Sequence, residues 1–144
     1  MKTTLSILLL ALALNSQAQD KKIKDENTVP SEVRNAFRKT FPTAKVTWEL
    51  EKDGNYEGEF KLKGKDASTV FDKAGHMKEL ETEIAEASLP EAARKYLQKN
   101  YPDKKIKEAA QITDDKGIVT YEAEIRINGK STDILFDSKG NLLK

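Results

Sequence analysis

The sequence YEGEFKLKGK at residues 56–65 returns as YEAEIRINGK at residues 121–130, an offset of 65. In both copies apolar and charged residues alternate before a glycine, a pattern typical of a half-buried β-strand that ends in a turn. The motif Phe-Asp-x-x-Gly follows each copy at the same offset. A segment that occurs twice predicts one structural unit used twice.

The repeat extends toward the N-terminus, where VPSEVRNAFRKTFP at residues 29–42 corresponds to LPEAARKYLQKNYP at residues 89–102. Here the offset is 60, so the second copy holds five additional residues between Pro102 and Tyr121. Apolar residues spaced three and four apart predict a helix in each copy, and the prolines mark its two ends. At this offset Trp48 of the first copy corresponds to Glu108 of the second.

Each copy is expected to be one helix followed by an antiparallel meander of three or four strands, an α+β fold. Turn sequences such as Asp-Gly-Asn at 53–55 and Asn-Gly at 128–129 separate the expected strands. One face of each meander is apolar and should pack on its helix, whereas the other face is charged. We expect a first repeat at residues 28–81, a linker at 82–88 and a second repeat at 89–144.

Residues 1–18 are expected to be a secretory signal peptide. Lys2 precedes an apolar run, and small residues stand before an expected cut after Ala18. The run is shorter than the roughly 20 apolar residues that an uncleaved membrane anchor needs. We therefore expect a periplasmic or secreted protein with no stable membrane insertion after signal cleavage. Residues 19–27 are charged and without periodicity, which predicts a disordered leader.

The charge of the chain bears on which partners it can bind, and its cysteine content bears on how the fold is stabilised. The whole chain has a net charge of +1 and no cysteine. Without residues 1–18 its basic and acidic residues balance, so it lacks the basic surplus that favours nucleic acid, and no nucleic-acid partner is expected. Because no disulfide can form, the fold must depend on its apolar cores.

The residues give little support to catalysis or metal binding. His76 lies in a turn where its counterpart is Asn141, so we expect it to be structural or solvent-exposed. Glu57 and Glu59 share one strand face and could serve calcium binding or acid/base chemistry. Neighbouring lysines make cross-strand salt bridges the better explanation. We therefore expect no enzyme, no catalytic residue, no metal site and no cofactor; a hydrolase is the weakest alternative.

Trp48 is the only tryptophan, and two interpretations of it compete. It alternates in phase with Val46 and Leu50, which favours packing in the core. Tryptophan is also enriched among residues that anchor protein interfaces, so a partner-binding role is the alternative.

The signal peptide, the paired hydrophobe-Pro and aromatic-Pro helix ends, and the motifs Tyr-Glu-x-Glu and Phe-Asp-x-x-Gly resemble the PepSY-like family of exported bacterial proteins. That family is also described as beta-lactamase-inhibitor-like, and the similarity covers residues 28–144. The resemblance implies tandem helix-plus-sheet units like those of the beta-lactamase inhibitory proteins, whose sheets grip a protein through a polar surface. It implies no catalytic activity.

The sequence therefore predicts a non-enzymatic exported module that binds a protein or peptide through its charged strand faces, with inhibition as one outcome. The alternative is a sensor that binds a small ligand or a cation such as calcium. The candidate partner-binding residues are Trp48, Glu49, Glu51, Glu57, Glu59, Lys61, Glu122, Glu124 and Arg126.

Overall fold

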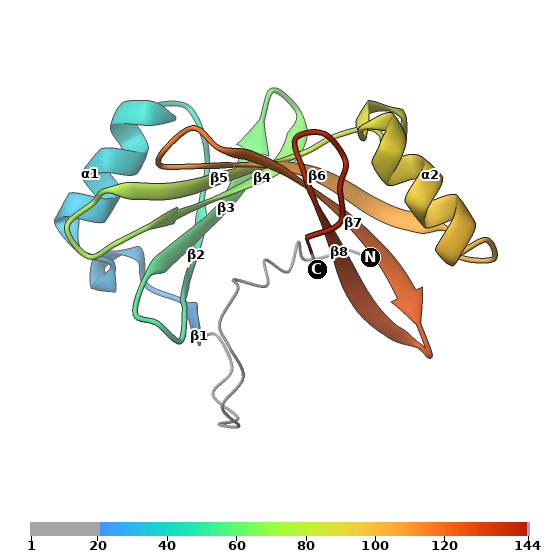
Figure 1. Ribbon diagram of the computed structural model, residues 1–144. Coiled ribbons are helices and arrows are strands. Elements are labelled where there is room, and N and C mark those ends of the chain that lie inside the picture. The colour runs from blue at the N-terminus through green and yellow to red at the C-terminus, as the bar shows by residue number, and fades with distance from the viewer. Residues whose placement is uncertain (1–20, 144) are drawn as a thin grey trace. The chain divides into compact units, whose positions relative to one another are not determined.

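The computed structural model describes residues 21–143 and divides into two compact units (Figure 1). Unit 1 ends at Leu80 and unit 2 begins at Glu81. Each unit combines a ten-residue α-helix with antiparallel strands, so the predicted α+β class is confirmed. The expected signal peptide and its cleavage site lie outside the described residues.

Unit 1 is an antiparallel sheet in the strand order β1-β2-β3-β4, with α1 beside it. The elements are β1 (Lys21–Ile23), the 3-10 helix η1 (Glu26–Thr28), α1 (Ser31–Thr40), β2 (Thr47–Leu50), β3 (Tyr56–Leu62) and β4 (Lys65–Phe71). The next strand, β5 (Met77–Glu83), crosses the boundary into unit 2. The helix buries Val33 and Phe37, two members of the apolar stripe that its sequence spacing predicts.

Unit 2 repeats this order of elements with longer strands. Its elements are the 3-10 helix η2 (Glu86–Ser88), α2 (Glu91–Asn100), β6 (Ile106–Asp114), β7 (Val119–Ile127) and β8 (Lys130–Asp137). The strand order is β6-β7-β8, and an isolated bridge pairs Phe136 of β8 with Leu142 after the last turn. The expected linker at 82–88 differs from the structure, because it includes the end of β5 and all of η2.

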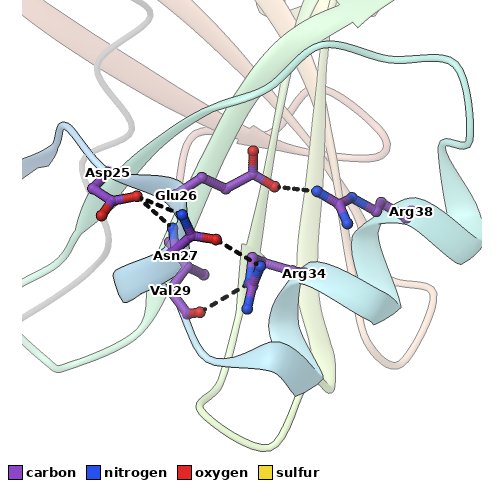
Figure 2. Close-up of polar contacts among 6 residues, drawn as sticks. All are labelled: Asp25, Glu26, Asn27, Val29, Arg34 and Arg38. Carbon is purple, nitrogen blue, oxygen red and sulfur yellow. Dashed lines mark hydrogen bonds and ion pairs between the residues drawn. The ribbon is translucent and has the colours of Figure 1, made fainter.

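The expectation of a disordered leader at residues 19–27 is wrong for the part that the structure describes. Strand β1 pairs with β2, and Ile23 packs against the core of unit 1. Figure 2 shows how the following residues are held on α1: Arg34 Nε donates to the Val29 carbonyl at 3.1 Å, and Arg38 forms a 2.7 Å ion pair with Glu26. The β1–β2 pairing and the ion pair between Glu26 and Arg38 join residues distant in sequence, so local composition gives no sign of them.

The strand pairing corrects the expected correspondence between Trp48 and Glu108. Trp48 lies opposite Gly58 in unit 1, whereas Ala109 lies opposite Ala123, the counterpart of Gly58, in unit 2. A β-bulge between Ile106 and Glu108 adds one residue to β6, so the offset of 60 no longer applies beyond it. Ala109 therefore occupies the position in unit 2 that Trp48 occupies in unit 1.

The turn of each Phe-Asp-x-x-Gly motif packs against the start of the helix in its own unit. Asp72 Oδ1 accepts hydrogen bonds from the backbone N–H groups of Ala74 and His76, and Asp137 does the same at its own turn. The glycine of the first turn, Gly75, has φ +83°, and a Cβ there would lie 2.6 Å from the carbonyl oxygen of Glu32 in α1. The motif therefore requires glycine for its backbone conformation and for its contact with the helix.

Replacing Gly75 with alanine should destabilise unit 1 far more than the same change at Gly64. Both glycines have positive φ, which costs alanine about 1–2 kcal/mol. Only Gly75 lies against the helix backbone, and that overlap adds about 1–3 kcal/mol, whereas nothing lies within 4 Å of a Cβ at Gly64. Urea denaturation of both variants measures the difference. Equal losses of stability would show that the contact with α1 has no energetic role.

Candidate functional site

Four glutamates of unit 1 lie on the strand face opposite the helix. The β2–β3 register places Glu49 directly opposite Glu57, and alternation along β3 adds Glu59. Glu51 follows the end of β2 and lies close enough for its charge to raise the pKa of Glu57. We call this set the carboxylate face: Glu49, Glu51, Glu57 and Glu59. Neighbouring strands are about 4.8 Å apart, so the four carboxyl groups lie close together.

The carboxylate face is not uniformly solvated, which differs from the expectation of an exposed charged face. Glu57 is 6% exposed and Glu51 is 9% exposed, whereas Glu49 and Glu59 are half-buried. Ser68 and Val70 on the neighbouring strand β4 are also buried and share this face. The centre of the face is therefore shielded from water, and its border is accessible.

Burial and like charge raise the pKa of Glu57 to about 8. Loss of hydration is the largest cause, and the negative charges of Glu51 and Glu59 add to it. Oε1 of Glu57 makes no hydrogen bond of good geometry within residues 21–143, although the Ser68 hydroxyl lies close enough to the carboxyl to lower its pKa in part. Glu57 is therefore mostly protonated at neutral pH.

The pKa of Glu59 is also raised. Burial raises its pKa first and the charge of Glu49 second, while Lys22 acts in the opposite sense. The hydroxyl of Thr47 donates a hydrogen bond to Glu59 Oε2 at 3.4 Å. Burial and like charge on the neighbouring strand thus raise the pKa of both Glu57 and Glu59.

Cross-strand ion pairs occur at the border of this face. Lys22 of β1 lies 3.5 Å from Glu49 of β2, and Lys61 of β3 lies 2.6 Å from Asp66 of β4. Neither pair contains Glu57 or Glu59, so these two pairs do not test the expected cross-strand salt bridges of those residues. Lys22, Lys61 and Asp66 are exposed, so each pair contributes little to stability.

The predicted residues of unit 2 lie on one face of β7. Glu124 accepts a 2.7 Å hydrogen bond from the hydroxyl of Ser131 and lies 3.5 Å from Lys107 Nζ. Glu122 is 7% exposed, and Arg126 is exposed. Glu124 therefore has a basic partner on its own face, unlike the arrangement around Glu57.

Trp48 lies in the core, which confirms the favoured interpretation. The side chain is 3% exposed, and its ring makes an edge contact with Phe37 at a centroid distance of 5.4 Å. Trp48 occupies the helix side of β2, opposite the carboxylate face. We therefore leave it out of the proposed binding surface.

His76 has the structural place that its turn position predicts. Its Nδ1 lies 2.9 Å from Asp72 Oδ2, and the ring is exposed. Hydrogen bonds from the His76 backbone and side chain lower the pKa of Asp72. Asn141 donates to Asp137 in the same way at 2.8 Å, so an ordinary amide replaces the imidazole in unit 2.

Sequence patterns did not predict the groove that lies beside α2 in unit 2. The groove has a volume of about 490 Å³ and an apolar floor that includes Leu97 and Ile125. Glu86, Gln98, Lys104 and Lys105 stand at its rim. The signal that could have revealed it is the replacement of Phe37 and Phe60 of the first copy by these smaller residues in the second.

Two kinds of feature are absent from residues 21–143. No group of three or more His, Cys, Asp or Glu side chains in this range is placed to hold a metal ion. Among the same residues, no helix has the length and apolarity needed to cross a bilayer.

The fold is similar to solved structures of Bacteroides proteins. One from Bacteroides eggerthii, described as "putative periplasmic", has 19% identity over 81% of this chain and 86% of its own, with a TM-score of 0.71. A DUF2874 family protein from Bacteroides uniformis has 21% identity over 80% and 86%, with a TM-score of 0.69. A BLIP-like protein from Bacteroides fragilis has 22% identity over 83% and 89%, with a TM-score of 0.62. At these identities the likeness shows the fold alone.

No curated protein matches the chain. One family does match it twice, over residues 15–79 and 54–144, and it is described as "Putative beta-lactamase-inhibitor-like, PepSY-like". That description refers to a likeness to inhibitors and names no catalytic activity. The two matches together cover most of the sequence, and the chain belongs to this PepSY-like family.

Proposed function

We propose that this chain is a non-enzymatic exported module that binds a basic segment of a protein or peptide through the carboxylate face of unit 1. One observation carries the proposal: Glu57 is buried among like charges, with its pKa raised to about 8 and with no hydrogen bond of good geometry at Oε1 in the described part of the chain. A buried polar group in this condition is costly unless a partner satisfies it.

A lysine or arginine side chain is the partner that satisfies the site. A cation beside Glu57 favours the ionised carboxylate, so binding lowers its pKa and releases a proton. The same cation offsets the repulsion between Glu57, Glu51 and Glu59 that now raises the pKa. Binding energy therefore comes from interactions that the free protein lacks.

Other features agree with an exported binding module. The predicted signal peptide, cut after Ala18, would bring the chain to the periplasm, where the relative from Bacteroides eggerthii is described as residing. We also propose that the two units form a tandem repeat, since the family matches twice. Inhibition of the bound protein is the outcome that the family description suggests.

Calorimetric titration with a capped peptide that alternates lysine and threonine tests the proposal. At pH 7 the reaction heat should differ between phosphate and Tris buffers, because nearly one proton is released and the two buffers take it up with different heats. Glu57→Gln should remove this difference, since an amide carries no ionisable proton. The control Glu124→Gln should keep it, because Glu124 lies on the other unit and is paired with Lys107.

Two outcomes would contradict the proposal. Equal heats in the two buffers would show that Glu57 does not meet the peptide. Calcium that displaces the peptide and releases the same proton would favour the alternative, a cation sensor that uses these carboxylates as oxygen ligands.

A further inference from the structure

The groove of unit 2 has an equivalent in unit 1 that is largely closed. We define the α2 groove by Glu86, Leu97, Gln98, Lys104, Lys105 and Ile125. The corresponding opening beside α1 has a volume of about 250 Å³, against about 490 Å³ for the α2 groove. Glu26 and Glu86 line the two openings at equivalent positions, related by the offset of 60. Three other lining positions related by this offset differ between the units: Phe37 and Leu97, Arg38 and Gln98, Ala44 and Lys104.

Aromatic rings fill the opening in unit 1. The ring of Phe37 lies 5.2 Å from that of Phe41 and 5.1 Å from that of Phe60, and the last two rings are 4.4 Å apart. In unit 2, Leu97 and Ile125 replace two of these rings, and Tyr101 contacts Tyr96 at 6.4 Å. These smaller side chains form the apolar floor of the groove. Both are buried, with Leu97 4% exposed and Ile125 1% exposed.

An ion pair spans the opening in unit 1, and the equivalent positions of unit 2, Glu86 and Gln98, cannot form it. Arg38 Nη2 lies 2.7 Å from Glu26 Oε1, as Figure 2 shows. Gln98 takes the place of Arg38 and carries no charge, so Glu86 cannot form that pair with it. The rim of the α2 groove therefore stays open on the side of η2.

The rim of the α2 groove carries its cations at different positions from its equivalent. Gln98 replaces the cation Arg38, Lys104 adds a cation where unit 1 has Ala44, and Lys105 has a counterpart in Lys45. The cations that line the α2 groove are Lys104, Lys105 and Arg94. These three cations face a single acid at the rim, Glu86. A partner whose apolar group is flanked by carboxylates is complementary to this combination.

We propose that the α2 groove is a second binding site, which takes a bulky apolar side chain flanked by acidic residues of a partner peptide. An aromatic side chain enters the space that the phenylalanines fill in unit 1, and its flanking carboxylates meet Lys104 and Lys105. The volume of the groove lies within the range of small-ligand sites, so one such side chain and its neighbouring backbone fit. This site is independent of the carboxylate face, which favours basic partners.

The probe is a capped five-residue peptide with phenylalanine at its centre and aspartates on both sides. Titration into isotope-labelled chain 19–144, followed by amide NMR shifts, should move Leu97, Gln98 and Lys105 most. A peptide with alanine at the centre, or with lysines as flanks, should bind at least about tenfold more weakly, a factor that corresponds to 1.4 kcal/mol. Binding of the lysine peptide at the same residues with equal affinity would overturn the proposal.

A double variant converts the rim of unit 2 to that of unit 1. Gln98→Arg with Lys104→Ala introduces residues that unit 1 already carries at these exposed positions, so the fold should persist. The double variant keeps the number of cations at the rim, but the new arginine can pair with Glu86 across the opening, as Arg38 does with Glu26, and the cation at 104 is no longer there to meet a flanking carboxylate, so binding should weaken about tenfold. Arg38→Gln in unit 1 is the matched control and should leave the affinity unchanged. Unchanged binding by the double variant would overturn the proposal.

Two other occupants are distinguished in the same experiment. Dodecanoate that moves the same amides and displaces the peptide at lower concentration would assign the groove to a fatty acid instead. Shifts at the groove that grow with protein concentration alone would assign it to a second copy of the chain. Either result would replace the peptide as the occupant, while buffer-dependent heats at Glu57 would still test the carboxylate face separately.

Discussion

Trp48→Ala lowers the free energy of unfolding by about 3–5 kcal/mol, the largest loss that we expect from one side chain in this chain. The indole contacts Phe37 and Phe71 at centroid distances of 5.4 and 6.3 Å. Gly58 on the facing strand makes room for it, since a Cβ there would lie 3.0 Å from the ring. Alanine would therefore leave a cavity lined by rigid aromatic rings and by a residue with no side chain to fill it.

Urea denaturation followed by circular dichroism measures this loss without depending on tryptophan fluorescence. Ile118→Ala is the control, because Ile118 is 57% exposed and its truncation should change stability by less than about 0.5 kcal/mol. A Trp48→Ala variant as stable as the control would place the indole outside the core.

Glu57→Gln raises stability by several kcal/mol at pH 8 and by only about 1 kcal/mol at pH 5. The pKa of Glu57 rises from 4.5 to about 8 on folding, so the folded chain binds this proton more tightly than the unfolded chain does. Its contribution is complete below pH 4.5 and is lost as the pH rises toward 8. At about 1.4 kcal/mol per pH unit, the loss has an upper limit of about 5 kcal/mol. The amide cannot ionise and avoids this loss.

Unfolding free energies of the wild type and of Glu57→Gln, measured from pH 5 to pH 8, test this expectation. The gap between the two should widen as the pH rises. Glu124→Gln is the matched control from the other unit, and it should retain the pH dependence of the wild type. A gap that stays constant over this interval would mean that Glu57 ionises with an ordinary pKa.

Sequence patterns predict the regular elements well because those elements depend on local periodicity. The helix stripe of α1 and the alternation in β3 are visible in any short window of the sequence. Strand β1 is not, because three residues show no period and become a strand only by pairing with β2. The bulge in β6 is hidden for a similar reason: only the facing strand shows that one residue is extra.

The candidate sites show the same limit more sharply. Alternation places Glu57 on the charged face, but burial and the nearness of Glu51 depend on the three-dimensional arrangement. The α2 groove arises from aliphatic residues at positions where the first copy has phenylalanine, a difference that matters only once Leu97 and Ile125 are known to meet. The sequence thus predicts which face of a strand each residue occupies, but it does not predict how far that residue is buried from water.

The contacts of the turn glycines also determine where this chain can be extended. Gly75 and Gly140 press their turns against a helix backbone, so residues inserted at 72–76 or 137–141 would push the sheet away from its helix. A Cβ at Gly117, in the turn that follows Asp114, would have nothing within 4 Å, and the neighbouring Ile118 is exposed. A foreign epitope or a fluorescent tag could therefore be inserted at residues 115–118, in a hairpin turn that has room for additional residues.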